Sequence, residues 1–325
     1  MLSYIIRRLL LGIPTVLGVL LILFILFFWV AKPEFIAKKA LGGDKAPPEQ
    51  IEAWIKAHGY DLPKFYNPEA GGMQRFSQTR IFQYYADMLS FKFGNSDLDD
   101  IPIQYKIRKG MGPSLTLTVP VFVVGLFISI GVSLLVALFR GTYVDKSVLV
   151  LCVIGMSVVY FLYIIGGQYY LGKVLRWFPI SGWSSRHMVH FLTMPWLVGI
   201  VAGIGSSVRF YRTIMVNEIN SDYVRTARAK GASDTALLFV HVLKNAMIPI
   251  LTGVVMAIPF LFTGSLLLES FFGIPGLGRL TVEAITNNDF RTISTMVFIS
   301  ALLYIFANLM TDISYTMVDP RVRLN

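Results

Sequence analysis

Long uninterrupted apolar segments constrain this chain more than any other feature of its sequence. A helix needs about twenty consecutive apolar residues to cross the hydrocarbon core of a bilayer. Only 15% of the residues are charged, against about a quarter in a soluble domain. The pattern therefore predicts an all-α membrane protein with six transmembrane helices. The six apolar segments are Leu9–Val30, Leu115–Phe139, Val148–Leu171, Phe191–Val208, Ala246–Leu268 and Ile293–Val318.

The first apolar segment is expected to remain in the mature protein. It follows Arg7-Arg8 directly and ends in the bulky sequence Phe27-Phe28-Trp29-Val30. A signal peptide would have a shorter apolar region and a cleavage site of small residues. The only cysteine, Cys152, falls inside the third segment, so no internal disulfide is expected.

The net charge of +10 is explained by membrane topology. With the N-terminus inside, the inner segments carry twelve Lys and Arg residues and the two short outer loops carry five. Cytoplasmic loops of membrane proteins carry such an excess of positive charge. The sequence predicts a multi-pass membrane protein with both termini in the cytoplasm. The bilayer is its expected partner; a nucleic acid is not.

The chain divides into three parts by composition. Residues 1–30 form the first transmembrane helix, and residues 31–110 form a small helical extracytoplasmic insert. Residues 111–325 form a five-helix core with a cytoplasmic loop at about 209–245. Within the insert, Pro47-Pro48-Glu49 predicts the start of one helix and Ile81–Phe91 predicts a second. The insert is either a structural cap or a docking surface for an external partner.

The basic segment Asn217–Leu251 carries the clearest local signals. Asn220-Ser221-Asp222 has the chemistry of a helix N-cap. A short helix is expected over Tyr223–Lys230, and Gly231 fits the left-handed position at its end. Ser233-Asp234 then predicts the start of a second helix.

Small residues beside this basic charge indicate a protein partner. They are Ala227, Ala229, Gly231 and Ala232, and they permit close approach by another backbone. A basic amphipathic helix resting on anionic lipid is the alternative. Lipid binding favours bulky apolar side chains, and alanine with glycine buries little apolar area.

Five segments together resemble one family, the B-type permease subunits of ABC importers for dipeptides, oligopeptides and nickel. The N-terminal segment reads YIIRRLLLGIPTVLGV, and the insert contains PEQIEAWIKAHGYDLP and YYADMLSFKFGNS. The basic loop contains DYVRTARAKGAS and HVLKNAMIPIL. The last loop and the C-terminus read ESFFGIPGLGRL and DISYTMVDPRVR. Their order around six apolar segments makes the resemblance span nearly the whole chain.

The resemblance implies the type I permease fold, a place in a bacterial or archaeal inner membrane, and half of a translocation pathway for peptides. An extracytoplasmic solute-binding protein would deliver the substrate. The other partners would be a second, C-type permease subunit and two ATP-binding subunits, which would hold ATP and Mg. This chain would then bind no cofactor and be non-catalytic. Similar machinery transports nickel, glutathione, oligosaccharides or antimicrobial peptides, and these substrates remain alternatives.

The resemblance also places contact with the ATPase on the basic loop. The sequence has Arg225-Thr226-Ala227 where importers in general have Glu-Ala-Ala, so no glutamate salt bridge is expected. Extra residues around Asn67–Arg80 are a second departure from the family pattern. The expected coupling residues are Tyr223, Arg225, Thr226, Ala227, Arg228, Ala229, Lys230, Gly231, Ala232 and Ser233.

Further candidates lie near the last two apolar segments. Glu269 and Arg279 flank a turn that contains Pro275, Gly276 and Gly278. The two charges either gate a zwitterionic peptide or form an ordinary loop ion pair. Other expected residues are Asn308 and Asp312, in structural or substrate contact, and Asp319, Pro320 and Arg321, which would anchor the C-terminus.

Other functional classes lack their residues. His187 and His190 are three positions apart, but two histidines are too few for a closed metal site, so no metal is expected. The sequence contains no HExxH, GxSxG or phosphate-loop motif and no pair of intramembrane aspartates, which argues against an intramembrane enzyme. A channel or secondary carrier usually shows intramembrane charges or an internal repeat. Only Asp312 meets that description.

Overall fold

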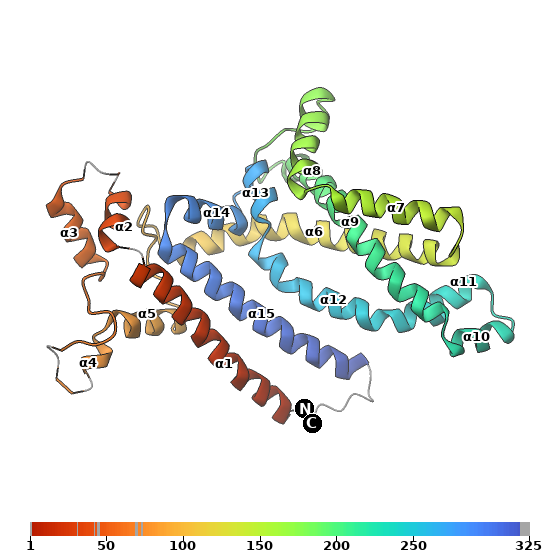
Figure 1. Ribbon diagram of the computed structural model, residues 1–325. Coiled ribbons are helices and arrows are strands. Elements are labelled where there is room, and N and C mark those ends of the chain that lie inside the picture. The colour runs from red at the N-terminus through yellow and green to blue at the C-terminus, as the bar shows by residue number, and fades with distance from the viewer. Residues whose placement is uncertain are drawn as a thin grey trace. The chain divides into compact units, whose positions relative to one another are not determined.

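The computed structural model describes residues 2–30, 32–41, 43, 46–68, 71–72 and 74–318. Within these ranges the chain is helical and contains no β-strand, apart from one isolated bridge between Asn95 and Pro102 (Figure 1). The predicted all-α class is confirmed. The α-helices, with π-helical segments labelled η, are α1 (Leu2–Phe24), η1 (Ile25–Val30), α2 (Pro33–Ala40), α3 (Pro48–Ala57), α4 (Gln74–Ser77), α5 (Arg80–Leu89), α6 (Ile103–Leu138), α7 (Tyr143–Ser157), α8 (Tyr160–Gly167), η2 (Gln168–Val174), α9 (Met188–Ile219), α10 (Asp222–Ala229), α11 (Asp234–Ala236), η3 (Leu237–Val242), α12 (Leu243–Thr263), α13 (Leu266–Phe272), α14 (Leu277–Asn287) and α15 (Phe290–Val318).

Five helical stretches among the described residues are long and apolar enough to cross a membrane. Their outer surfaces expose large apolar side chains; Phe127 on α6, for example, is 70% exposed. A bilayer would remove such side chains from water, and the helices satisfy their own backbone hydrogen bonds. The stretches are Ile6–Phe28, Ile103–Leu138, Met188–Ile219, Asp234–Phe272 and Phe290–Ser314.

The third predicted span, Val148–Leu171, is wrong as a single continuous helix. It is divided between α7 and the α8–η2 pair, whose axes differ by 89°. The break falls at Val158 and Val159, which both have extended backbones. The Tyr163 hydroxyl donates to the Gly155 carbonyl across the bend at 2.9 Å, and the Val158 N–H donates to the same carbonyl at 3.3 Å. The described chain thus has five spans, or six if the bent pair is one span.

The chain forms two compact units. The first contains residues up to 111 and residues 280–309. In it, α1 runs beside α15 (Figure 1), where a Cβ added at Gly12 would lie 3.0 Å from the Ile305 side chain. The end of α1 packs into an aromatic cluster, in which the ring centroids of Phe24 and of Tyr84 in α5 are 5.8 Å apart. The two helices predicted in the insert are confirmed as α3 and α5.

The second unit contains residues 112–279 and the end of α15. Its centre is α9, which packs against α7 and α12 (Figure 1). A Cβ added at Gly205 of α9 would lie 2.9 Å from the Cys152 carbonyl oxygen, so the two helices meet at a small residue. Hydrogen bonds also join helices here: the Ser133 hydroxyl of α6 donates to the Val208 carbonyl of α9 at 3.0 Å.

Candidate functional site

The basic segment folds into the predicted hairpin. Helix α10 ends before Gly231, whose φ of +84° is a left-handed conformation that an L residue adopts only under strain. The next helix, α11, begins at Asp234, and the side chain of its N-cap residue Ser233 accepts a hydrogen bond from the Ala236 N–H at 3.3 Å. Ser221 stands at the N-cap of α10, but its hydroxyl donates back to the Glu218 carbonyl at 2.6 Å. Residues 220–242 comprise α10, the turn at Gly231, α11 and η3. We call this segment the α10–η3 hairpin.

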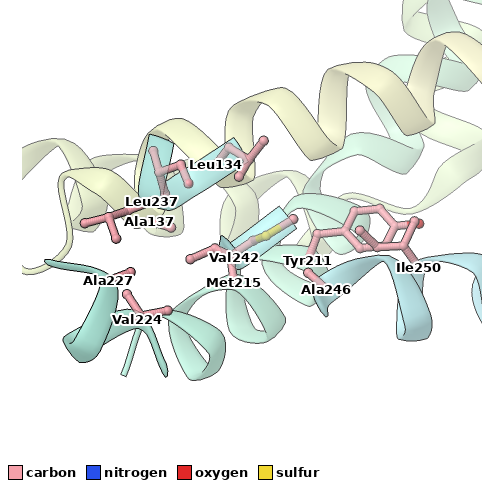
Figure 2. Close-up of a cluster of buried hydrophobic side chains, with 11 residues drawn as sticks. Leu134, Ala137, Tyr211, Met215, Val224, Ala227, Leu237, Val242, Ala246 and Ile250 are labelled. Carbon is pink, nitrogen blue, oxygen red and sulfur yellow. The ribbon is translucent and has the colours of Figure 1, made fainter. Parts of the chain in front are cut away.

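The apolar side of α10 is buried in the protein's own core. Val224 and Ala227 are 2% and 9% exposed. Figure 2 shows both side chains in a cluster with Ala137 of α6, Met215 of α9 and Leu237 of η3. Ala232 packs on the same cluster. The expectation that Ala227 belongs to an accessible small-residue face is therefore wrong, because the core of this chain covers it, whereas Ala232 stays partly accessible.

The opposite side of α10 forms an exposed polar face. Two ion pairs cross this surface, Arg225 with Asp222 and Arg228 with Asp234, each at 3.6 Å. Such exposed pairs contribute about 0–1 kcal/mol, so they leave the guanidinium groups free to change partners. Since the apolar side is buried, α10 cannot also lie with that side in a lipid surface. The exposed residues are Tyr223, Arg225, Thr226, Arg228, Ala229, Lys230, Gly231 and Ser233.

An ion pair that the sequence did not predict fixes α7 against α9 beside the hairpin. Arg212 donates through Nε and Nη2 to the two oxygens of Asp145, at 2.6 and 2.7 Å. The Asp145 side chain is 4% exposed and that of Arg212 is 17% exposed. Bidentate pairs of this kind are strong and directional. Arg212 was counted only among the inner basic residues in the sequence, and Asp145 was not singled out, because nothing local shows that they meet.

The turn at Pro275-Gly276 is built around Glu269, which is fully buried. Its carboxylate accepts from the Ser114 hydroxyl at 2.8 Å, the Ser265 N–H at 3.1 Å and the Arg279 N–H at 3.0 Å. The expectation of an exposed gating charge or an exposed loop ion pair at Glu269 is therefore wrong. Its carboxylate instead holds α6, α13 and the start of α14 together.

The glycines of this turn make room for that carboxylate. A Cβ at Gly276 would lie 2.3 Å from Oε2 of Glu269, and a Cβ at Gly264 would lie 2.3 Å from Oε1. At Gly278 it would meet the backbone of Ser265 at 2.7 Å. Pro275 is exposed. Glycine is needed here for close approach of backbone to the buried charge.

Comparison with known proteins decides the family. Residues 114–324 match the family described as binding-protein-dependent transport system inner membrane component. A probable peptide ABC transporter permease protein of Sinorhizobium fredii is 33% identical over 78% of this chain and 82% of its own length. The oligopeptide transport system permease protein of Bacillus subtilis is 29% identical over 99% of both chains. A glutathione transport system permease protein of Salmonella paratyphi A is 29% identical over 99% of both chains.

The chain belongs to this family of inner membrane transport components. The resemblance inferred from the sequence is thereby confirmed, and the protein is a multi-pass inner membrane permease. The match covers both the α10–η3 hairpin and the Glu269 turn.

The remaining candidates of this permease lie on or beyond α15. Asn308 lines a cavity of about 210 Å³ between α1 and α15, together with Tyr304 and Gly12. Asp312 is partly buried on the same helix. Its structural or substrate role stays a prediction. Asp319, Pro320 and Arg321 lie outside the described residues.

A buried polar cluster in the first unit also escaped the sequence analysis. Asp289 accepts from the Ser96 hydroxyl at 2.5 Å and from the Asp97 N–H at 3.2 Å. Asp97 accepts from the Tyr60 hydroxyl at 3.2 Å and from the Arg291 N–H at 3.1 Å. Burial raises the pKa of the Asp97 carboxyl, and the positive charge of Arg291 opposes this shift. The cluster joins the insert to the start of α15.

Lys106 provides positive charge beside this cluster. The Lys106 ammonium lies 2.7 Å from an Asp99 oxygen and 2.9 Å from the Ser96 hydroxyl. Within the described residues, no three His, Cys, Asp or Glu side chains gather as a metal-binding set.

Proposed function

We propose that this permease is one half of the translocation pathway of an ATP-driven peptide importer. Its partners would be a C-type permease subunit, two ATP-binding subunits and an extracytoplasmic binding protein. Both termini and the α10–η3 hairpin would face the cytoplasm, and the insert would lie outside. ATP and Mg would be held by the partner subunits, and this chain would be non-catalytic.

One observation carries the coupling part of the proposal: α10 exposes only its polar side and buries its apolar side. Val224 and Ala227 share a core with Leu134 of α6, Met215 of α9 and Ala246 of α12 (Figure 2). Side chains in mutual contact transmit displacement from one helix to the next. An ATPase that moved α10 would therefore move the ends of three spans together.

The coupling step follows from differential binding. An ATPase pair that closes on ATP would favour one position of the hairpin over another, and the packed helices would switch between two arrangements. The Asp145–Arg212 pair would keep α7 and α9 moving as one body. The exposed Arg225 and Lys230 would meet the ATPase surface.

Peptides are the proposed substrate because two of the relatives are named peptide or oligopeptide permeases. Glutathione, itself a small peptide, is the named substrate of a third relative's system. Since Glu269 is buried within the turn, we do not assign it to substrate recognition. Specificity would then depend mainly on the binding protein that delivers the substrate.

Co-purification in mild detergent from the native membrane tests the assembly. We expect two ATP-binding subunits and a second permease, and a lone homo-oligomer would contradict the proposal. The variant Gly231→Val tests the hairpin, because it places a branched side chain on the exposed corner. Gly141→Val is the matched control: its φ is +79° and, like Gly231, it has open space within 4 Å. We expect loss of coupled ATP hydrolysis or of the ATPase in the first variant alone.

A further inference from the structure

A cavity of about 390 Å³ lies beneath the α10–η3 hairpin in the second unit. The ends of three spanning helices line it: Leu138 at the end of α6, Ile219 at the end of α9 and Asp234 at the start of the next span. This volume falls in the range of small-ligand sites, about 300–1,000 Å³. Leu138 lies at the end of the apolar segment Leu115–Phe139, so the α6 wall of the cavity lies near the depth where lipid headgroups begin.

The cavity lining has an apolar part and a charged part, which match the two parts of a phospholipid. Leu138, Ile219 and Leu237 supply apolar walls, and Arg140, Arg228 and Asp234 supply the charges. The charged lining is therefore positive by one unit, from two arginines and one aspartate. Basic pockets between transmembrane helices on the cytoplasmic side bind anionic headgroups.

Both guanidinium groups retain donors for a ligand. A guanidinium has five N–H donors. Arg140 uses one to reach Asn220 Oδ1 at 2.5 Å. Arg228 lies 3.6 Å from Asp234, which is beyond hydrogen-bond distance, and its side chain is 65% exposed. A phosphate between the two arginines would gain charge-assisted hydrogen bonds from both.

We propose that this cavity binds the headgroup of an anionic phospholipid, with its phosphate on Arg140 and Arg228 and its glycerol and first methylenes against Leu138 and Leu237. The lipid would support the hairpin through its contacts with Arg228 and Leu237. The amount of anionic lipid would then set how firmly the hairpin is held. The inference rests on the proposed function only in placing this end of the spans in the cytoplasmic leaflet.

Photolabelling in nanodiscs tests the site. The full-length protein, with the subunits that co-purify, is reconstituted in phosphatidylcholine with a trace of photoreactive phosphatidylglycerol. We expect labelled peptides from residues 137–140 and 219–242. Unlabelled phosphatidylglycerol should compete, whereas phosphatidylcholine and inorganic phosphate should not.

Variants identify the groups responsible. Each arginine near an anionic headgroup contributes about fivefold to binding, so Arg140→Gln should lower labelling about fivefold and the double variant with Arg228→Gln about thirtyfold. Arg140→Lys should retain most of it. Arg209→Gln is the control, because Arg209 is exposed on α9 outside the cavity and should label normally.

Three results would overturn the proposal. Undiminished labelling in Arg140→Gln and in the double variant would show that the arginines do not hold the lipid. Equal competition by inorganic phosphate would make the cavity a site for free anions. Labelling that occurs only after the ATPases are removed would show that a protein partner fills the cavity. Absence of ATPases from the preparation would count against the proposed function alone, since labelling is scored without transport.

Discussion

Replacing Glu269 by glutamine keeps the size of a buried side chain but removes half of its accepting capacity. The carboxylate accepts from Ser114, Ser265 and Arg279, and also from the Gly278 N–H. A glutamine has one accepting oxygen, and its NH₂ group must then face N–H groups that also donate. At least two buried hydrogen bonds are lost. At about 1–2 kcal/mol for each unsatisfied donor, Glu269→Gln should cost about 2–4 kcal/mol.

The assay heats the protein in detergent and measures the midpoint temperature, at which half of the monodisperse protein has been lost. At roughly 2 °C per kcal/mol for a chain of this size, the midpoint should fall by about 4–8 °C. Gly276→Ala should also lower it, because the new Cβ would lie 2.3 Å from Oε2 of Glu269. Gly203→Ala is the control, since nothing lies within 4 Å of its Cβ position. Unchanged midpoints in both test variants, with altered transport, would refute the structural role and restore a gating role.

Three further predictions use the same midpoint assay. Asp145→Asn should cost about 3–5 kcal/mol of stability, because it leaves the charge of Arg212 without its partner. Adding Arg212→Gln should recover part of this loss. If the double variant instead lost the sum of the two single-variant costs, a direct pair would be contradicted. Burial raises the pKa of Asp97 in the folded state. Its ionised form therefore opposes folding, so its contribution is most favourable below its ordinary pKa and is lost as pH rises through the raised value. Asp97→Asn should flatten that dependence above about pH 4, and an unchanged slope would exclude Asp97 as its source. Tyr163→Phe removes the hydrogen bond to Gly155, so it should lower the midpoint by about 2 °C and broaden spin-label distances across the 89° bend; a distance distribution like that of the unaltered protein would show that the bend is held by other contacts.

Features with a local cause could be predicted from the sequence. Hydropathy located five of the spans, because burial in lipid requires about twenty apolar residues wherever the chain crosses. The hairpin could be predicted because Gly231 and Ser233 act within a few residues of their own positions. Family membership could be inferred for a similar reason, since the motifs are contiguous.

The candidate site required the tertiary structure. Ala227 looked like part of a contact surface until the core formed by α6, α9 and η3 covered it. Asp145 with Arg212 and Asp97 with Asp289 are pairs brought together from distant parts of the chain. No local pattern identifies such partners.

The sequence by itself determined that this chain is a helical membrane permease and where the α10–η3 hairpin turns, because hydropathy, capping and left-handed glycine act over short distances. Only the tertiary structure decided that the third apolar segment bends at Val158 and that the buried Glu269 supports the turn at Pro275-Gly276. The physical reason is that burial and hydrogen-bond satisfaction belong to the packed chain. The sequence places Glu269 in a loop, where exposure is expected, but in the folded chain its carboxylate is buried and accepts hydrogen bonds from four donors.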